Sequence, residues 1–210
     1  MGEPQEIREN WALFLDLDGT LLDIAPRPDA VEVPDGLTGD LQRVSRGLNG
    51  ALAVVSGRSM DVLDELLHPF APPGGAEHGA VVRHPDGTLD AVKAGLFPPE
   101  WMRRLRRAAE RWRGIVIEEK PRSVVVHYRL APERGAEIQK LVETLPDLQR
   151  EGFAILESKM AFEVKPRHSS KARAVALLME EAPFAGRVPV FVGDDITDED
   201  GIAMARRLGG

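Results

Sequence analysis

The chain of 210 residues contains no cysteine, which excludes disulfide bonds and thiolate metal sites and leaves the redox compartment open. No apolar stretch approaches the length of a membrane span. Residues 1–6 are polar and acidic, and no hydrophobic signal region follows them. We therefore expect a cytoplasmic protein that does not bind membranes.

Basic residues are in the minority, with 27 lysines and arginines against 34 aspartates and glutamates. The formal net charge of −7 argues against a general nucleic-acid-binding protein. Two signatures of other phosphate chemistries are also absent. The sequence has no Gly-x-x-x-x-Gly-Lys-Ser/Thr loop for nucleotide hydrolysis. Its five histidines are scattered, whereas two-metal phosphatases cluster their ligands.

Two closely spaced aspartates directly follow the apolar run 11–15, which is typical of a strand buried on both faces. On an extended backbone Asp16 and Asp18 point the same way, and Gly19 allows a sharp exit from the strand. Two like charges about 4 Å apart repel by about 4 kcal/mol at an effective dielectric of 20. A divalent cation, a shared proton or a lysine must compensate, unless these are ordinary capping carboxylates of an Asp-Gly turn.

Other apolar runs also end in polar residues. Run 51–55 ends at Ser56-Gly57-Arg58, run 188–192 ends at Gly193-Asp194-Asp195, and a weaker strand is expected over 76–82. Segments with helical periodicity separate or follow these runs, at 36–48, 60–67 and 170–181. Strands that alternate with helices predict a parallel α/β sheet between helical layers.

The middle of the chain has a different order of elements. Helices are expected at 100–113 and 132–145, and each is followed by two strands, at 115–119 and 124–130, then at 153–157 and 160–165. This αββαββ order suits a small antiparallel sheet with helices on one face. We therefore predict an α+β cap over residues 97–164, inserted into an α/β core formed by residues 1–96 and 165–210.

Two candidate site residues follow from their places in these elements. Ser56 ends a buried strand, where its hydroxyl could bind a phosphoryl oxygen or cap the next helix. Lys171 falls in the first turn of a helix opened by Ser169 and Ser170, where the macrodipole disfavours a cation. A lysine there makes sense if it faces an anion that the helix start also attracts. A solvated surface lysine is the alternative.

Residues 194–200 contain five acids in seven positions. Thr197 with Asp200 reads as a helix N-cap with acids in the first turn, which accounts for Asp198 but not for Asp194 and Asp195. Carboxylates without nearby histidine or cysteine suit Mg²⁺, which takes one or two protein carboxylates and keeps several waters.

The chain thus carries four motifs in order: Asp-x-Asp-Gly-Thr at 16–20, a serine at the end of a strand (Ser56), a lysine at the start of a helix (Lys171) and Gly-Asp-Asp at 193–195. Together they resemble the haloacid dehalogenase superfamily of aspartate-based phosphotransferases. The resemblance covers residues 11 to about 82 and 166 to 207, and it implies a Rossmann-like parallel sheet core. It implies that Asp16 is the nucleophile and that Asp18 is the general acid and base. It further implies that Ser56 and Lys171 hold the phosphoryl oxygens, that Mg²⁺ is bound by Asp16, the Asp18 carbonyl and Asp194, and that Asp195 supports Lys171 or the metal shell.

The expected cap sheet has a charged face. Alternation over residues 159–165 puts Lys159, Ala161, Glu163 and Lys165 on one side, and Glu118 and Lys120 share a side in the same way. Such a face suits sugar hydroxyls, or it is an ordinary solvent-exposed sheet face.

Longer stretches resemble trehalose-6-phosphate phosphatases. They are residues 18–26, 55–59, 75–79, 126–129 and 193–200. The resemblance runs from about residue 11 to the end of the chain. It implies Mg²⁺-dependent hydrolysis of trehalose 6-phosphate. The substrate contacts that it implies are Glu118, Lys159 and Glu163, then Lys120, Arg58 and His78, and also Gly19, Thr20 and Gly57 beside the catalytic groups. His78 could equally be structural.

One departure from the family pattern concerns its end. The family normally continues with at least one more strand and a helical segment beyond Leu208-Gly209-Gly210.

Two other functions remain open, namely hydrolysis of another sugar phosphate and an inert sugar-phosphate-binding module. We expect a monomer.

Overall fold

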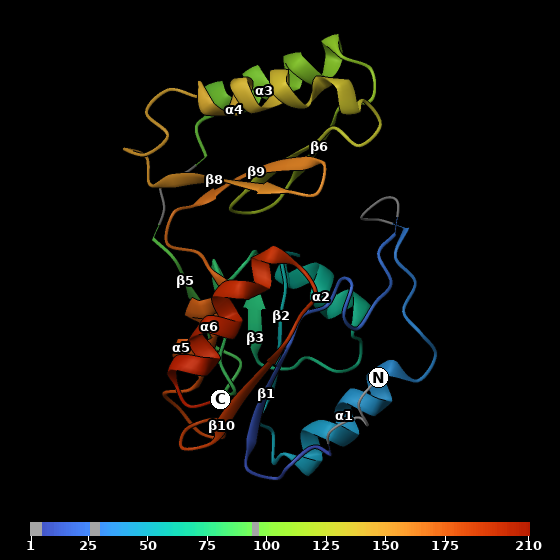
Figure 1. Cartoon of the computed structure of the whole chain (residues 1–210), viewed down its shortest axis with the longest axis vertical. Coiled ribbons are helices and arrows are strands. Elements are labelled where there is room, and N and C mark those ends of the chain that lie inside the picture. The colour runs from blue at the N-terminus through green and yellow to red at the C-terminus, as the bar shows by residue number, and fades with distance from the viewer. Residues whose placement is uncertain (1–5, 26–29, 94–96) are drawn as a thin grey trace. The chain divides into compact units, whose positions relative to one another are not determined.

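The computed structural model describes residues 6–25, 30–93 and 97–210 (Figure 1). The chain divides into two compact units: unit 1 combines Met1–Ala91 with Ser170–Gly210, and unit 2 is Val92–Ser169. From the sequence, the boundaries of the inserted cap were expected between residues 96 and 97 and between residues 164 and 165. In the structure unit 2 begins earlier and ends later than this.

Unit 1 contains a six-stranded sheet in the order β10-β1-β2-β3-β4-β5. The bounds are β1 (Trp11–Leu15), β2 (Leu52–Val55), β3 (Gly74–Ala76), β4 (Val81–Arg83), β5 (Leu89–Ala91) and β10 (Val188–Val192). The pairs β10–β1, β1–β2 and β2–β3 are parallel, whereas β4 and β5 pair antiparallel. The predicted α/β class is confirmed.

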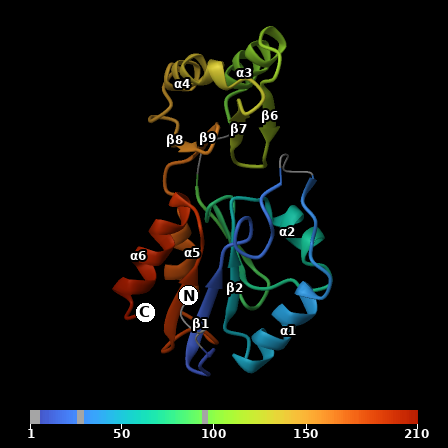
Figure 2. The same ribbon diagram turned by 45° about the vertical axis from the view of Figure 1, so that its right-hand side comes forward.

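Helices cover both faces of this sheet (Figure 2). Helices α1 (Leu37–Gly47) and α2 (Met60–Leu66) lie on one face, and α5 (Lys171–Leu178) and α6 (Glu199–Arg207) lie on the other. Strands β1 and β2 are buried on both sides, which explains their uninterrupted apolar sequences. Parallel register aligns Leu15 with Val192 and with Val54, so the polar residues that follow these strands emerge at one edge.

The single strand expected over 76–82 is wrong, because the chain reverses within it. Glu77, His78 and Gly79 have φ values of 48°, 54° and 78° in succession. This left-handed turn joins β3 to the antiparallel β4, so the expected strand is split in two.

Unit 2 contains a four-stranded antiparallel sheet in the order β6-β7-β9-β8. Its elements are α3 (Pro99–Arg111), β6 (Val116–Glu119), β7 (Val124–His127), α4 (Gly135–Glu143), β8 (Phe153–Ser158) and β9 (Ala161–Pro166), with a 3₁₀ turn η2 (Pro132–Arg134) before α4. Both helices lie along one face of the sheet (Figure 1). There Trp101, Leu105 and Ile138 pack against Val126 and Phe162.

The strand expected over 160–165 begins one residue later than predicted. Lys159 and Met160 form the turn between β8 and β9, and Met160 has φ 62°. A two-residue hairpin needs left-handed backbone, which removes Lys159 from the alternating strand pattern.

Across the described part of the chain, no helix has both the length and the apolar character needed to cross a membrane.

Candidate active site

A buried lysine between two aspartates lies at the polar edge of the unit 1 sheet. Asp16 follows β1, Lys171 begins α5, and Asp198 ends the 3₁₀ turn η3 (Ile196–Asp198). The Lys171 Nζ lies 2.5 Å from Asp16 Oδ1 and 2.5 Å from Asp198 Oδ1. Lys171 is 2% exposed, Asp16 is 4% exposed and Asp198 is 0% exposed. Lys171 is thus one of the compensating groups that the sequence left open for this pair of aspartates.

The electrostatics of this cluster are unbalanced, because one ammonium serves two carboxylates. Burial raises the pKa of Asp16 from 3.8 to about 6. The charge and hydrogen bond of Lys171 act to lower this pKa, whereas the charge of Asp198 raises it. Asp16 is thus a desolvated carboxylate in contact with Lys171, a state suited to nucleophilic attack.

The partner of Lys171 differs from the expected one. The resemblance gave Asp195 a supporting role, either for Lys171 or for the metal shell, whereas the structure pairs Lys171 with Asp198. The Asp195 carboxylate instead accepts from Ile196 N at 2.8 Å, and Asp195 N donates to Asp198 Oδ2 at 3.0 Å. The Thr197 N-cap is therefore wrong, since a capping box between Asp195 and Asp198 opens η3. Their three-residue spacing was the signal that could have identified this capping box.

Three carboxylates at this edge could hold a cation. One oxygen each of Asp16, Asp194 and Asp198 lie within 4.8 Å of one another. Asp194 is exposed and lies against Gly19, where an added Cβ would clash with its carboxylate. Gly19 also has φ 91°, so both space and backbone require glycine there. A set of carboxylate oxygens without histidine fits a hard divalent cation such as Mg²⁺.

Asp18 forms a separate ion pair beside this cluster. Arg58, which follows β2, donates from Nε to Asp18 Oδ2 at 2.7 Å and from Nη2 to Oδ1 at 2.6 Å. A bidentate contact of this kind fixes the plane of the carboxylate. Arg58 was expected to contact the sugar, and in the structure it holds Asp18.

The remaining candidates in unit 1 lie in adjoining loops. Ser56 is buried, and its Oγ accepts from Arg58 N at 3.2 Å, so it caps its own turn rather than helix α2. The His78 ring packs over Gly57, where a Cβ would lie 2.5 Å from Nε2. The Thr20 Oγ1 is buried without a hydrogen-bond partner among the residues that the structure describes.

Unit 2 brings together three of its four expected contacts on the sheet face opposite the helices. Lys120 Nζ lies 3.4 Å from Glu163 Oε1 and 4.0 Å from Glu118 Oε1. Glu118 and Glu163 both stand opposite Val125 in the register of the sheet. Lys159 is exposed in the β8–β9 turn and lies outside this row.

Two further residues, which the sequence analysis missed, extend this polar row. Ser123 Oγ donates to Glu163 Oε1 at 2.6 Å, and His127 Nε2 lies 2.8 Å from Glu118 Oε2. Burial acts to raise the pKa of Glu118, but the His127 hydrogen bond and the nearby Lys120 charge outweigh it and lower the pKa. An ionised Glu118 can only accept, so His127 is the donor.

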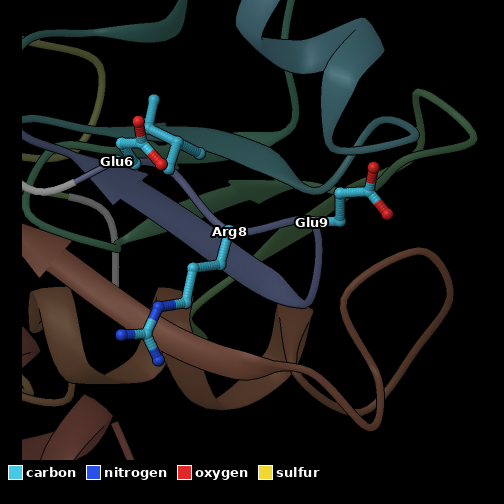
Figure 3. A pocket seen from close by; sticks show the side chains of 4 residues that line it. Glu6, Arg8 and Glu9 are labelled. Carbon is cyan, nitrogen blue, oxygen red and sulfur yellow. The ribbon is translucent and has the colours of Figure 1, made fainter.

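A cavity of about 550 Å³ lies in unit 1 near the start of β1, at the opposite end of this strand from Asp16. It is lined by Glu6, Ile7, Arg8 and Glu9. Figure 3 shows that the labelled side chains of Glu6, Arg8 and Glu9 point in different directions. Neighbours in sequence that diverge do not form a convergent binding site, so this cavity does not mark the candidate site.

Comparisons with known proteins agree with this geometry. A family model described as trehalose-phosphatase matches residues 14–208. A probable trehalose-phosphate phosphatase of Sinorhizobium fredii is 44% identical over 204 residues, covering 96% of this chain and 76% of the relative. The trehalose-6-phosphate phosphatase of Escherichia coli is 39% identical over 209 residues, covering 99% of this chain and 78% of the relative.

Solved structures support the same fold. The C-terminal domain of the Candida albicans trehalose-6-phosphate phosphatase matches with a TM-score of 0.79 at 22% identity, covering 95% of this chain and 74% of that one. An Aspergillus fumigatus trehalose-6-phosphate phosphatase matches with a TM-score of 0.58 at 27% identity, covering 96% and 79%. The resemblance seen in the sequence motifs is confirmed, and the chain belongs to the trehalose-phosphatase family.

Proposed function

We propose that this protein is a Mg²⁺-dependent phosphatase that hydrolyses trehalose 6-phosphate to trehalose and phosphate. The observation that carries the proposal is the buried Asp16 carboxylate, with Lys171 Nζ at 2.5 Å. This pairing puts a nucleophile beside a cation that can receive phosphoryl oxygens. The substrate follows from the family and from the names of the relatives at 39–44% identity.

In the first step, an Asp16 oxygen attacks phosphorus. The new bond between this oxygen and phosphorus forms as the bond between phosphorus and the sugar oxygen breaks. Asp18, in its protonated form, gives its proton to the leaving sugar oxygen. Because Asp18 is held at both oxygens by Arg58, it exchanges at least one of these contacts to reach the leaving group.

In the second step, Asp18 takes a proton from water, and the water oxygen attacks the phosphorus of the aspartyl-phosphate. The bond to Asp16 breaks, which releases phosphate and restores the carboxylate. Lys171 and the Ser56 hydroxyl hold the phosphoryl oxygens through both steps. Asp16, the Asp18 carbonyl and Asp194 would hold Mg²⁺, which would supply positive charge that offsets the repulsion between carboxylate and phosphate.

We infer that the polar face of unit 2 recognises sugar hydroxyls. Glu118 and Glu163 offer carboxylate acceptors, and Lys120 between them offers donors. Hydrogen bonds to charged groups are roughly twice as strong as neutral ones, which suits a ligand made of hydroxyls. The side chains are already held in place, so less side-chain entropy is lost on binding.

The test is phosphate release from trehalose 6-phosphate, in Mg²⁺ and in EDTA, with glucose 6-phosphate as the comparison substrate. We expect release only with Mg²⁺ and a clear preference for the disaccharide. Asp16→Asn, with an unchanged fold by circular dichroism, should release none. Equal rates on unrelated sugar phosphates would exclude the assigned substrate, and turnover by Asp16→Asn would exclude the assigned nucleophile. Sedimentation should give the mass of a monomer.

A further inference from the structure

Arg173 connects the start of α5 to two other segments of unit 1. It lies two residues after Lys171, on the same helix. Its Nη1 donates to the carbonyl oxygen of Gly79 at 2.8 Å, and its Nη2 lies 3.1 Å from Asp90 Oδ1. The Arg173 side chain is 20% exposed, whereas that of Asp90 is 47% exposed. A largely buried guanidinium thus ties the helix of the catalytic lysine to a loop and to β5.

The loop that Arg173 binds has a left-handed backbone conformation that residues other than glycine rarely adopt. Glu77, His78 and Gly79 are all left-handed, and two of them are not glycine. At Gly79, a Cβ would clash with the carbonyl oxygen of Ser170, directly before α5. Backbone of this kind persists only where its surroundings determine it. The Arg173 hydrogen bond to Gly79 is one such determinant.

The same loop also holds the segment after β2. Glu77 N donates to the carbonyl oxygen of Arg58 at 2.8 Å, and His78 N donates to that of Ser56 at 2.9 Å. These two hydrogen bonds fix Ser56 and Arg58 to the loop. Arg173 fixes the same loop to α5. Loop 77–79 therefore links two sets of candidate catalytic groups.

We propose that Arg173 is a positioning residue for phosphoryl transfer. It holds the Gly79 carbonyl and so sets the distance between Lys171 on α5 and Ser56 after β2. Asp90 in turn orients the guanidinium of Arg173. The inference deepens the proposed function, because it assumes that Lys171 and Ser56 act on one phosphoryl group.

Removing the hydrogen bond between Arg173 and Gly79 should lower the catalytic rate by more than the accompanying loss of stability explains, because small misplacements of reacting groups have large effects on rate. We expect Arg173→Ala to lower kcat about thirtyfold and to raise the inhibition constant of inorganic phosphate about tenfold. Arg173→Lys keeps one donor for Gly79 and should recover most of this loss. Asp90→Asn keeps the Gly79 bond and should lower kcat only about threefold.

Arg187 offers a matched control in unit 1. Its Nη1 also donates to backbone carbonyls, those of Glu9 and Trp11, but at the opposite end of the strands. Arg187→Ala should lower the melting temperature by a similar amount while kcat and the phosphate inhibition constant stay within twofold of wild type. Equal losses of kcat in Arg173→Ala and Arg187→Ala would overturn the proposal, as would an unchanged kcat in folded Arg173→Ala.

The same ratios are measured with 4-nitrophenyl phosphate, which has no sugar. Failure of the wild type to hydrolyse trehalose 6-phosphate would then overturn the substrate assignment without deciding the role of Arg173. Failure to hydrolyse both esters overturns the proposed function and this inference together. If Arg173→Ala does not fold, Arg173→Met takes its place, because methionine keeps the apolar part of the side chain and removes its donors. An unchanged kcat in Arg173→Met overturns the proposal.

Discussion

We expect the buried Asp16 carboxylate to lower the free energy of unfolding of the protein. Its pKa rises from 3.8 to about 6, chiefly through burial. Between these two values the folded protein keeps a proton that the unfolded chain has lost. The free energy of unfolding therefore falls as the pH rises through this window, and the full penalty is present above pH 6. A shift of about 2 units corresponds to about 3 kcal/mol.

Asp16→Asn should therefore stabilise the protein in EDTA at pH 8. The amide keeps an oxygen for Lys171, and Asp198 remains its charged partner. Allowing for a weaker hydrogen bond, we expect a gain of about 2 kcal/mol, or a rise of about 4–8 °C in melting temperature for a chain of this size. The gain should shrink at pH 5, where wild-type Asp16 is largely protonated in the fold.

Thermal unfolding of both proteins at pH 5 and pH 8 measures this difference. Asp18→Asn is the control, since Asp18 is more exposed and lies in an ion pair with Arg58, so its removal should give no gain. Adding Mg²⁺ should stabilise the wild type more than Asp16→Asn. If Asp16→Asn melts below the wild type at pH 8 in EDTA, the Lys171 ion pair outweighs burial and the reasoning fails.

Three other substitutions test the assigned roles. Lys171→Met should lower kcat at least a hundredfold and destabilise the fold by about 3–5 kcal/mol, because two buried carboxylates lose their cation; a chemical denaturation curve like that of the wild type would contradict this. Asp198→Asn should lower kcat about a hundredfold and Asp195→Asn less than tenfold, because of these two acids only Asp198 contacts Lys171. The reverse order in steady-state assays would restore Asp195 as the supporting acid. Glu163→Gln should raise KM for trehalose 6-phosphate about tenfold without changing the Mg²⁺ requirement, through loss of a charged acceptor for a sugar hydroxyl; an unchanged KM would exclude Glu163 from recognition.

The positions of Asp16, Ser56 and Asp194 were predictable because strand ends are visible in the sequence. A buried parallel strand is an apolar run, and its polar successor marks the edge of the sheet. Alternation similarly predicted that Glu118 and Glu163 face away from the helices of unit 2. These signals are local and depend only on the period of the backbone.

The features that the sequence did not predict depend on contacts between distant segments. Asp198 looked like a first-turn acid, and only the approach of α5 makes it the partner of Lys171. The reversal at residues 77–79 depends on hydrogen bonds to Ser56 and Arg58, which no short sequence pattern encodes. Asp18 and Arg58 are 40 residues apart, and neither segment alone indicates their pairing.

The division of the chain has a consequence for biosynthesis. Lys171 and Asp16 are 155 residues apart, and unit 1 draws on both Met1–Ala91 and Ser170–Gly210. Unit 2 is continuous in sequence, so it can fold before the ribosome has added β10, the edge strand that pairs with β1. Once folded, it brings Ala91 and Ser170 within the span of one compact body, which shortens the effective loop that unit 1 must close. A nascent chain acquires its reactive centre only after translation has passed Asp198.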